Sequence, residues 1–505
     1  MSHSLHSLLK AIGLDVPIDL QDPEIKNISS DSRCVKKGDL FFGLPGQKDN
    51  GGAFCNEAFL AGAVAAVVGD SARDCIPHDK KNLVVVVPDP VSQWMGEIAS
   101  VFWGKPSLEM ALIGVTGTNG KTTTTHLIEH LSKSSGKATA LLGTLINRWP
   151  KYSEQSIHTT SFGDTLNAQL SQIVASGASL CAMEVSSHAL SQRRVAGLYF
   201  SGAIFTNLTQ DHLDYHKSME AYFEAKALLF QSYLIKDGQA RAVVNIDDQW
   251  GFRLAKRLGR NCWKSSLDLK NIQSVRPELF ITGIKMTAAG AEGFIHTPFG
   301  EGPFMTPLIG RFNLMNLLQS IGVLLQQGFK LDTLLHATAT FSGVPGRMEQ
   351  VKVPVKSDSL PMPIVLVDYA HTPDGLKNAL KAVRPFVSGK LICVFGCGGD
   401  RDKSKRSYMG EIAAEISDIV IVTSDNPRTE DPMAIIEDIL SGIPTTFEAI
   451  VELDRCKAIE MSILHAKSND LIIIAGKGHE DYQILGDKKI YFNDKEAAIE
   501  ALEKR

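Results

Sequence analysis

Short runs of apolar residues, each followed by a polar loop and then by a helical pattern, recur along most of this 505-residue chain. Such short runs, bounded by glycine or polar turns, are typical of strands buried in a parallel sheet. Stretches with apolar residues three or four positions apart are typical of the helices that cover such a sheet. The alternation of the two predicts an α/β protein whose sheets are mostly parallel.

The elements fall into three groups. In the first hundred residues we expect a helix over 53–63 and strands over 39–43, 65–68 and 83–87. After a break at 104–107, we expect strands over 110–115, 179–185, 198–206 and 242–245, β-rich structure around 270–310, and a helix over 313–327. After a glycine- and proline-bearing hinge at 342–347, the predicted strands are 364–368, 391–396, 419–423 and 471–475. The chain is too long for one hydrophobic core, and the breaks predict domains over 1–106, 107–341 and 342–505.

Composition excludes several classes of protein. The net charge of −4 gives no basic field for nucleic acid, and no apolar run reaches the roughly 18 to 20 residues of a membrane helix. The first residues lack the features of a signal peptide, and the eight cysteines have no framework spacing. Cys393 and Cys397 are separated by Val-Phe-Gly and lie inside an apparent strand and turn, which disfavours a zinc site. We expect a reduced, cytoplasmic protein without membrane insertion and, although the sequence carries no oligomerisation signal, a monomer.

A glycine-rich loop follows the strand predicted at 110–115. Its sequence, Gly117-Thr-Asn-Gly-Lys-Thr-Thr123, leads directly into a helical pattern, the context in which backbone N–H groups hold phosphates. A strict Walker A motif would place a glycine at position 115, where this chain has Val115. The context nevertheless predicts ATP or GTP bound through phosphate and Mg2+.

Acidic residues and histidines follow the next two strands. Glu184 ends one of them and could ligate Mg2+ directly or through water, although a surface acid is the plain alternative. The segment 211–216 holds two aspartates and two histidines, which favours metal or phosphate chemistry over a solvated loop. Lys226 lies on a helical stretch, and by composition alone it is an ordinary exposed lysine.

Four polar clusters follow the strands of the third group. They are 368–374, 396–406, 424–428 and 476–480. Because ligands bind beyond the carboxyl ends of strands in doubly wound sheets, these clusters predict one site. Arg428 can grip a carboxylate with both guanidinium nitrogens, while Asp425 and Asn426 can hold an amine.

Together these segments resemble the Mur ligase family, ATP-dependent amide-forming enzymes of peptidoglycan precursor synthesis, over essentially the whole chain. The motifs are 31–33, 38–40, 117–123, 184–190, 211–216, 312–313, 346–349, 368–373 and the glycine–aspartate–arginine cluster at 398–401. The resemblance implies three domains: an N-terminal domain that binds a UDP-linked substrate, a central P-loop ATPase domain with a mostly parallel sheet, and a C-terminal doubly wound, Rossmann-like domain that binds an amino acid.

Within the family, the tetrad Asp425-Asn-Pro-Arg428 resembles that of members that add meso-diaminopimelate to UDP-N-acetylmuramoyl-L-alanyl-D-glutamate. Diaminopimelate differs from lysine by a second carboxylate at its far end. An arginine would bind that carboxylate, whereas it would repel the ammonium of lysine and be left desolvated without a partner.

The resemblance also implies a role for each candidate residue. The ATP site would comprise Gly117, Thr118, Asn119, Gly120, Lys121, Thr122, Thr123, Asn313 and Arg347. The metal site would comprise Thr122, Glu184, His212 and Lys226, with Lys226 carbamylated to N6-carboxylysine. The UDP-substrate would contact Ser30, Ser32, Thr159, Thr160, Ser186, Gln192 and Arg194. Diaminopimelate would contact Arg401, Asp425, Asn426, Pro427, Arg428, Gly476 and Glu480. Lys121, Lys226 and His212 would be catalytic.

The implied reaction proceeds through an acyl phosphate. The D-glutamate carboxylate attacks the γ-phosphate of ATP, and the incoming amine then displaces phosphate. Three departures from the family pattern leave local detail open: Ser161-Phe162 after Thr160, Ser407, and Ser424 before the tetrad.

Two other functions stay possible from the sequence. One is a sister ligase, such as a folylpolyglutamate synthetase or a different Mur enzyme, with the same ATP chemistry and another acceptor. The other is a nucleotide-binding regulatory protein without turnover, which would be expected to lack metal ligands or Lys121.

Overall fold

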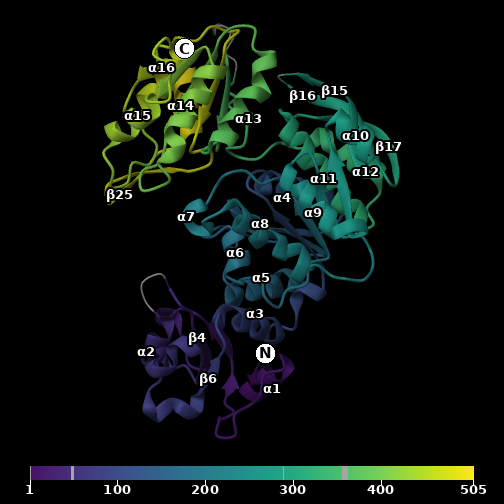
Figure 1. The fold of residues 1–505 in the computed structure, drawn as a ribbon, viewed down its shortest axis with the longest axis vertical. Coiled ribbons are helices and arrows are strands. Elements are labelled where there is room, and N and C mark those ends of the chain that lie inside the picture. The colour runs from purple at the N-terminus through teal and green to yellow at the C-terminus, as the bar shows by residue number, and fades with distance from the viewer. Residues whose placement is uncertain (1, 47–49, 288, 355–361) are drawn as a thin grey trace.

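Three bodies follow one another along the long axis of the computed structural model (Figure 1). The structure describes residues 2–46, 50–287, 289–354 and 362–505. Each body is built on its own main sheet. We call them the N-terminal, central and C-terminal domains in chain order, and together they confirm the three-domain α/β architecture.

The N-terminal domain is a four-stranded parallel sheet covered on both faces. Its strands, in spatial order, are β3 (Asn27–Ser29), β4 (Asp39–Gly43), β5 (Ala65–Gly69) and β6 (Val84–Val87). Side chains of β4 alternate between the two layers: Leu40 and Phe42 pack against α1 (Leu5–Ala11) and α3 (Val91–Phe102), whereas Phe41 packs against α2 (Cys55–Ala61). The short strands β1 (His3–Ser4) and β2 (Glu24–Ile25) pair beside this layer.

Helix α3 joins the N-terminal domain to the central domain. It packs against α5 (Gly163–Ala175). A Cβ atom at Gly96 would lie 2.5 Å from the carbonyl oxygen of Ala196, so only glycine allows this approach. The hydroxyl of Ser92 donates to the carbonyl of Gln192 at 2.6 Å. The N-terminal domain is therefore held next to the segment that carries Gln192 and Arg194.

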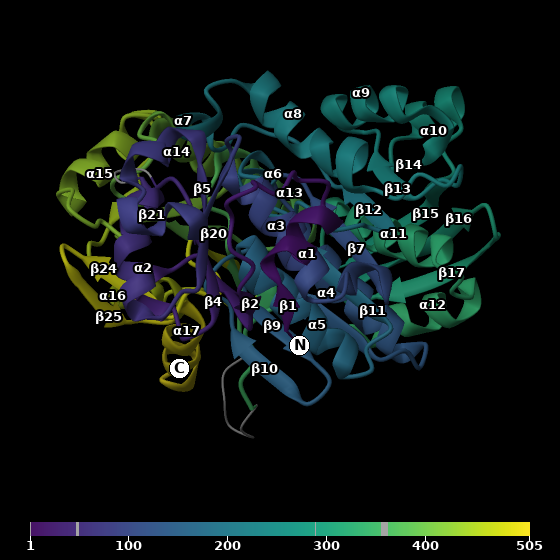
Figure 2. The ribbon, with the colours of Figure 1, turned by 90° about the horizontal axis from the view of Figure 1, so that it is seen from below.

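The central domain contains an 11-stranded sheet. Figure 2, seen along the long axis, shows it extending from β9 and β10 to β16 and β17. It is parallel from β8 to β15 and ends in antiparallel hairpins. In spatial order the strands are β10 (Tyr152–Gln155), β9 (Ile146–Trp149), β8 (Thr139–Leu142), β11 (Leu180–Glu184), β7 (Ala111–Thr116), β12 (Gly202–Phe205), β13 (Ala242–Asn245), β14 (Cys262–Ser266), β15 (Leu279–Thr287), β16 (Gly290–Thr297) and β17 (Gly300–Thr306).

Helices cover both faces of this sheet. One face packs on α4 (Lys121–Ser134), α11 (Arg311–Gln326) and α12 (Leu331–Ala337), the other on α5, α8 (Met219–Leu228) and α9 (Gln249–Leu258). The short helices α6 (Ser187–Ser191), α7 (Leu213–His216) and α10 (Leu269–Val275) lie in the connections. Two expectations were wrong in extent. The strand expected over 198–206 is only β12, because 198–201 is irregular apart from an isolated β-bridge at Phe200, and the β-rich region expected from 270 begins only after α10.

The C-terminal domain is a six-stranded, doubly wound sheet. The order is β18 (Glu349–Gln350), β19 (Ile364–Asp368), β23 (Leu471–Ala475), β20 (Leu391–Phe395), β21 (Ile419–Val422) and β22 (Ile450–Val451), with β18 antiparallel at the edge. One face packs on α13 (Pro373–Val383), α14 (Ser404–Ile416) and α15 (Pro432–Leu440), the other on α16 (Arg455–Leu464) and α17 (Asp494–Glu503). A hairpin of β24 (Tyr482–Leu485) and β25 (Lys488–Tyr491) lies apart from this sheet. The four strands expected here are confirmed.

A buried ion pair fixes α16 and α17 to the sheet. The Arg455 guanidinium donates from Nε and Nη2 to the two carboxylate oxygens of Asp494, each at 2.7 Å, and both side chains are 0% exposed. Nη2 also donates to the carbonyl of Ala475 at 3.0 Å, at the end of β23. No helix in the described ranges is long and apolar enough to cross a membrane.

Asp494→Asn is expected to destabilise the C-terminal domain by about 3 kcal/mol, because it leaves the Arg455 charge buried without a counter-ion. The five tryptophans lie between positions 94 and 263, so their fluorescence does not report on this domain. Hydrogen exchange of the β23 amides is the suitable measurement. Glu496→Gln, an exposed acid in the same turn of α17, is the control and should change stability by less than about 0.5 kcal/mol. Equal exchange in the two variants would contradict the assigned role of the pair.

Candidate active site

The glycine-rich loop connects β7 to α4, and two of its glycines are required by close contacts. Gly117 has φ of 152°, and a Cβ atom there would lie 1.9 Å from the Thr206 hydroxyl oxygen. Gly120 has φ of 89° at the N-cap of α4, and its Cβ would lie 2.5 Å from Oδ1 of Asn316. The loop therefore delivers the chain to the amino end of a 14-residue helix, whose N–H groups and dipole favour phosphate.

The segment that follows β12 holds the loop in shape. The Thr206 hydroxyl donates to the carbonyl of Asn119 at 2.6 Å, and the Asn119 N–H donates to Oδ1 of Asn207 at 2.9 Å. The Thr118 N–H donates to the Asn207 carbonyl at 2.9 Å. Strand β12 lies beside β7 in the sheet, so the two carboxyl ends support one another.

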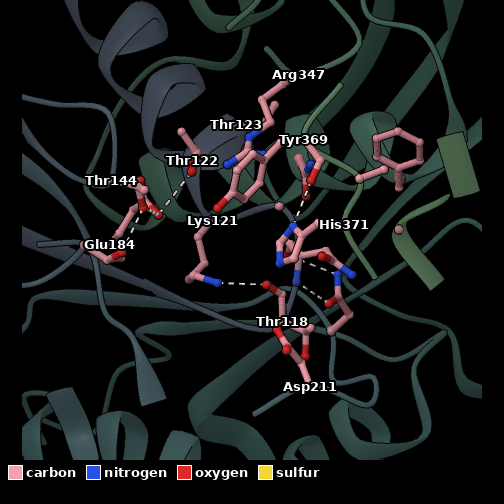
Figure 3. Close-up of a pocket in the computed structure, with 18 of the residues that line it drawn as sticks. Thr118, Lys121, Thr122, Thr123, Thr144, Glu184, Asp211, Arg347, Tyr369 and His371 are labelled. Atoms are coloured by element: carbon pink, nitrogen blue, oxygen red, sulfur yellow. Dashed lines mark hydrogen bonds between the residues drawn. The ribbon is translucent and has the colours of Figure 1, made fainter. Parts of the chain in front are cut away.

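Two lysines share one carbonyl of the loop. The Nζ atoms of Lys121 and Lys226 each donate to the carbonyl oxygen of Gly117 at 2.8 Å, from α4 and α8 respectively. Lys226 is only 1% exposed, so the interpretation of it as an ordinary exposed lysine was wrong. Figure 3 shows Lys121 reaching back over the loop.

Burial changes the acid–base state of these lysines. It holds the pKa of Lys226 well below its usual range, and the positive charge of Lys121 lowers it further. Burial also lowers the pKa of Lys121, against the opposing effect of Glu184. Two ammonium groups at one carbonyl are unfavourable, and Lys226 is the one whose charge is the less stable.

Oxygen atoms suited to Mg2+ meet beside the loop. The Glu184 carboxylate, 0% exposed at the end of β11, accepts from the Thr122 hydroxyl at 3.2 Å and from the Thr144 N–H at 2.8 Å (Figure 3). Thr144 follows β8 and was missed in the sequence, although its place after a strand is the same signal that marked Glu184. Among the described residues no group of three or more acids, histidines and cysteines is arranged so that it could hold a metal ion by itself. A few hard oxygen ligands completed by phosphate oxygens is the arrangement that Mg2+ favours.

His212 and Asp211 lie on the other side of the loop. Nε2 of His212 is 3.4 Å from the Asp211 carboxylate. Burial, followed by the neighbouring cations, lowers the pKa of His212 to about 4 despite that carboxylate. The imidazole is therefore neutral near pH 7 and able to bind a metal. His216 lies further along α7, where its Nε2 is 3.0 Å from the Ser187 hydroxyl.

A cavity of about 290 Å³ surrounds the loop and is lined by both the central and C-terminal domains. Asn313 reaches it from α11, and Arg347 reaches it from the predicted hinge, with its guanidinium 4.2 Å from the centre of the Tyr369 ring. The side-chain amide of Asn119 donates to Asp374 at 3.3 Å, which links the loop to the C-terminal domain. All of the candidate ATP residues except Gly117 line this cavity, and the Gly117 carbonyl accepts hydrogen bonds from two of the lining residues, Lys121 and Lys226.

The candidate UDP-substrate residues form a connected group rather than one pocket. Arg194 donates from Nη1 to the carbonyl of Thr160 and from Nε to Gln192, both at 2.9 Å. The Thr160 hydroxyl accepts from the Ser186 N–H at 3.1 Å, and Thr159 bonds Thr144 at 3.1 Å. Only Thr159 and Ser186 of this set line the cavity around the loop.

Ser30, one of the candidates from the N-terminal domain, contacts α5 of the central domain. Its hydroxyl donates to the Asp164 carboxylate at 2.6 Å, whereas Ser32 lies half-buried in the next turn. Phe162, one of the departures from the family pattern, supports Arg194, whose guanidinium lies 3.9 Å from the ring centre. An aromatic ring thus packs against the arginine at a position where this chain departs from the family pattern.

A second cavity, of about 980 Å³, gathers the strand-end clusters of the C-terminal domain. It is lined by Arg401, Asp425, Asn426, Arg428, Gly476 and Glu480, as expected for one site. Pro427 is the exception: its carbonyl faces Gly399, where a Cβ would lie 1.9 Å away. Tyr482 also lines this cavity and was missed, because it lies on a hairpin strand with no polar motif.

The hairpin strand β24 fixes the tetrad. Arg428 has φ of 53°, and its N–H donates to the Ile484 carbonyl at 3.1 Å. The Gln483 side chain donates to the Asp425 carbonyl at 2.7 Å, and the Ile484 N–H donates to Oδ1 of Asn426 at 3.0 Å. Ser424, another departure, is buried, with its carbonyl 3.5 Å from Arg455. Ser407 lies in the first turn of α14.

The two cavities meet at a common wall. Asp211, His212, Tyr369 and His371 line both of them. One cavity contains a loop of the phosphate-binding type beside oxygen atoms suited to a hard cation. The other is lined by arginines and carboxylates. Together they indicate an α/β nucleotide-dependent enzyme with a second site for a small charged ligand.

Comparison with known proteins agrees with this class. Residues 24–103 match "Mur ligase family, catalytic domain", 115–324 match "Mur ligase middle domain" and 346–478 match "Mur ligase, glutamate ligase domain". A UDP-N-acetylmuramoyl-L-alanyl-D-glutamate--2,6-diaminopimelate ligase of Prochlorococcus marinus is 60% identical, covering 99% of each chain. The Gloeobacter violaceus protein of the same name is 49% identical over 506 residues, covering 99% of this chain and 98% of its own. This chain belongs to the Mur ligase family.

Solved structures give the same result. A UDP-N-acetylmuramoyl-L-alanyl-D-glutamate--2,6-diaminopimelate ligase aligns with a TM-score of 0.70 and 33% identity, covering 100% of this chain and 99% of its own. The MurF ligase from Thermotoga maritima in complex with ADP aligns with a TM-score of 0.63 and 16% identity, covering 95% and 97%, which supports the fold alone.

Lys121→Ala is expected to lower phosphate release from ATP by at least about a hundredfold, because it removes a cation held at the phosphate loop. Phosphate release in the presence of all substrates is the measurement. Lys133→Ala makes the same change in the last turn of α4, where the side chain is 52% exposed, and should leave the rate nearly unchanged. Similar rates in both variants would contradict the assignment.

Proposed function

We propose that this chain is an ATP-dependent amide ligase that adds meso-diaminopimelate to UDP-N-acetylmuramoyl-L-alanyl-D-glutamate in peptidoglycan precursor synthesis. The observation that carries the proposal is the common wall of the two cavities, lined by Asp211, His212, Tyr369 and His371. It allows a carboxylate activated beside the phosphate loop to meet an amine held by the tetrad. The names of the full-length relatives support the same reaction.

The reaction has two steps. The D-glutamate carboxylate attacks the γ-phosphorus of ATP, ADP leaves, and an acyl phosphate forms. The neutral amine of diaminopimelate then attacks the acyl carbon, loses a proton and expels phosphate, which leaves the amide. Lys121 stabilises charge on the transferred phosphoryl group. Contact between the domains at Asn119 and Asp374 supports exclusion of water from the acyl phosphate.

Mg2+ would be held by Thr122 and Glu184, with His212 nearby, and would supply charge neutralisation at the phosphates. These side chains fit the ion because Glu184 and Thr122 present adjacent oxygens 3.2 Å apart in a buried setting. The neutral imidazole of His212 adds a nitrogen ligand.

Substrate binding is divided between the domains. Ser30, Ser32, Thr159, Thr160, Ser186, Gln192 and Arg194 would bind the UDP-linked acceptor, and the tetrad with Arg401, Gly476 and Glu480 would bind diaminopimelate. We also propose domain limits at 106/107 and 341/342. Gly104 and Lys105, both at positive φ between α3 and β7, support the first limit. A cytoplasmic monomer remains our expectation.

The sister-ligase alternative is less well supported. A Mycobacterium tuberculosis folylpolyglutamate synthase aligns with a TM-score of 0.59 but at 16% identity, which indicates a common fold only. The regulator alternative requires lost ligands, whereas Lys121, Thr122 and Glu184 are all in place.

The purified enzyme with ATP, Mg2+ and UDP-N-acetylmuramoyl-L-alanyl-D-glutamate should release phosphate when meso-diaminopimelate is added. L-Lysine should be at least about a thousandfold poorer in kcat/KM, because it leaves the half-buried Arg428 without a carboxylate. Arg428→Met should raise the KM for diaminopimelate and reduce this preference. Equal rates with both amino acids, or release with lysine alone, would contradict the proposal.

We further propose that Lys226 carries a carbamate. A carbamate forms only from a neutral amine, and burial lowers the pKa of Lys226, which increases the share of the neutral form at a given pH. The adduct is therefore expected to persist to lower pH than it would on an exposed lysine, and protonation of the amine should release it as pH falls further. A 13C NMR signal from labelled bicarbonate, present in the wild type and absent in Lys226→Met, would identify it. Turnover of a wild-type enzyme that lacks this signal would exclude the carbamate.

A further inference from the structure

The side chain of Lys477 lies beneath the amino-acid pocket, in the turn that follows β23. It is flanked by Gly476 at φ of 115° and Gly478 at φ of 54°. A Cβ at Gly476 would lie 2.7 Å from Oδ2 of Asp425, and one at Gly478 would lie 2.7 Å from the Gly346 carbonyl oxygen. The two glycines allow a tight turn, and the lysine between them is 0% exposed.

The ammonium of Lys477 contacts the residues proposed to bind the amine. Its Nζ donates to Oδ1 of Asn426 at 3.1 Å and to Oε2 of Glu480 at 3.2 Å, and it lies 4.0 Å from Oδ1 of Asp425. All three partners line the cavity of about 980 Å³, whereas Lys477 is not among the lining residues. The lysine therefore contacts residues that line the pocket without lining the pocket itself.

These contacts fix the orientation of Asn426. Its Oδ1 accepts one hydrogen bond from Lys477 and one from the Ile484 N–H at 3.0 Å, which accounts for both lone pairs of this oxygen. Its Nδ2 donates to Oε2 of Glu480 at 2.9 Å. Lys477 thus orients both the amide and the carboxylate that face the ligand.

The charges of this group have a simple sum. Asp425 and Glu480 carry two negative charges, and Lys477 cancels one of them. One net negative charge remains on this group, and the positive charges of Arg428 and Arg401 lie in the same cavity. That combination matches a zwitterionic end group with one ammonium and one carboxylate, whereas two uncompensated acids would favour an ammonium alone.

We propose that Lys477 is a positioning residue that acts as the internal counter-charge of the amino-acid pocket and makes it selective for a zwitterionic end group over a simple amine. The inference rests on the proposed function. In this proposal Arg428 binds the carboxylate of the ligand, and Lys477 offsets one of the two negative charges of Asp425 and Glu480.

The alternative is that Lys477 has a purely structural role. Arg455, another buried cation of this domain, is an example of such a role. Arg455 pairs with Asp494, an acid that does not line the pocket. Among the residues that the structure describes, the ion-pair partners of Lys477 are Asp425 and Glu480, both in the pocket. Its charge is therefore shared with the ligand site.

The test is the ratio of kcat/KM for meso-diaminopimelate to that for L-lysine, from phosphate release. Lys477→Met should lower the ratio at least about tenfold, chiefly through a higher KM for diaminopimelate, while the KM values for ATP and the UDP-linked acceptor change less than about twofold. Lys477→Gln keeps a donor for Asn426 without the charge and should lower the ratio similarly. Lys504→Met removes an exposed lysine that pairs with Glu460 at 2.8 Å in the same domain, and should leave the ratio unchanged.

A compensating variant separates charge from packing. Lys477→Met combined with Glu480→Gln restores one net negative charge. Its kcat/KM ratio should be at least about threefold higher than that of Lys477→Met alone, although the double variant binds both amino acids more weakly. An unchanged ratio in Lys477→Met and Lys477→Gln, or a lower ratio in the double variant than in Lys477→Met, would overturn the inference. If the wild type releases no phosphate with diaminopimelate, the proposed function itself fails. Normal wild-type turnover with an unchanged ratio in the variants contradicts only the role of Lys477.

Discussion

The carbonyl oxygen of Gly117 is the point on which the nucleotide site depends. It accepts from both Lys121 and Lys226 at 2.8 Å, and it can do so only because Gly117 has no side chain to collide with Thr206. Burial lowers the pKa of Lys226, and the positive charge of Lys121 at the same acceptor lowers it further. Conversion of that lysine to a carbamate would exchange the repulsion for attraction, so the same geometry that disfavours two cations favours a cation beside an anion.

The C-terminal domain handles buried charge in two ways. Arg455 is neutralised by Asp494 inside the core and joins α16, α17 and β23. Lys477 is neutralised by acids of the ligand pocket, so its charge belongs to the chemistry of the site. The distinction matters because a buried pair is weak evidence for stability, whereas a buried charge shared with a pocket changes which ligands that pocket accepts.

Much of the fold and part of the site follow from the sequence alone. The strands around 39–43, 242–245, 364–368 and 471–475 were predicted because short apolar runs between polar turns have few other solutions. The start of β12 was not, because Leu198 and Phe200 pack into the core from irregular backbone outside the strand. The burial of Lys226 was invisible to composition, since it depends on the distant Gly117. Tyr482 was missed because its strand meets the tetrad only when the chain after β23 returns beside Arg428, and the role of Lys477 was not predicted although the cluster 476–480 was.

That return of the chain has a consequence for how substrate preference can evolve. Arg428 is held at positive φ by backbone bonds to β24, about fifty residues later in the sequence, and Asn426 is oriented from the same strand. A lineage that exchanged the arginine alone would keep a backbone shaped for it. Adaptation to another amino acid therefore requires the tetrad and the hairpin to change together, and recombination that separates the two segments would yield enzymes without a working pocket. The hairpin is inherited as part of the specificity, although only one of its residues lines the pocket.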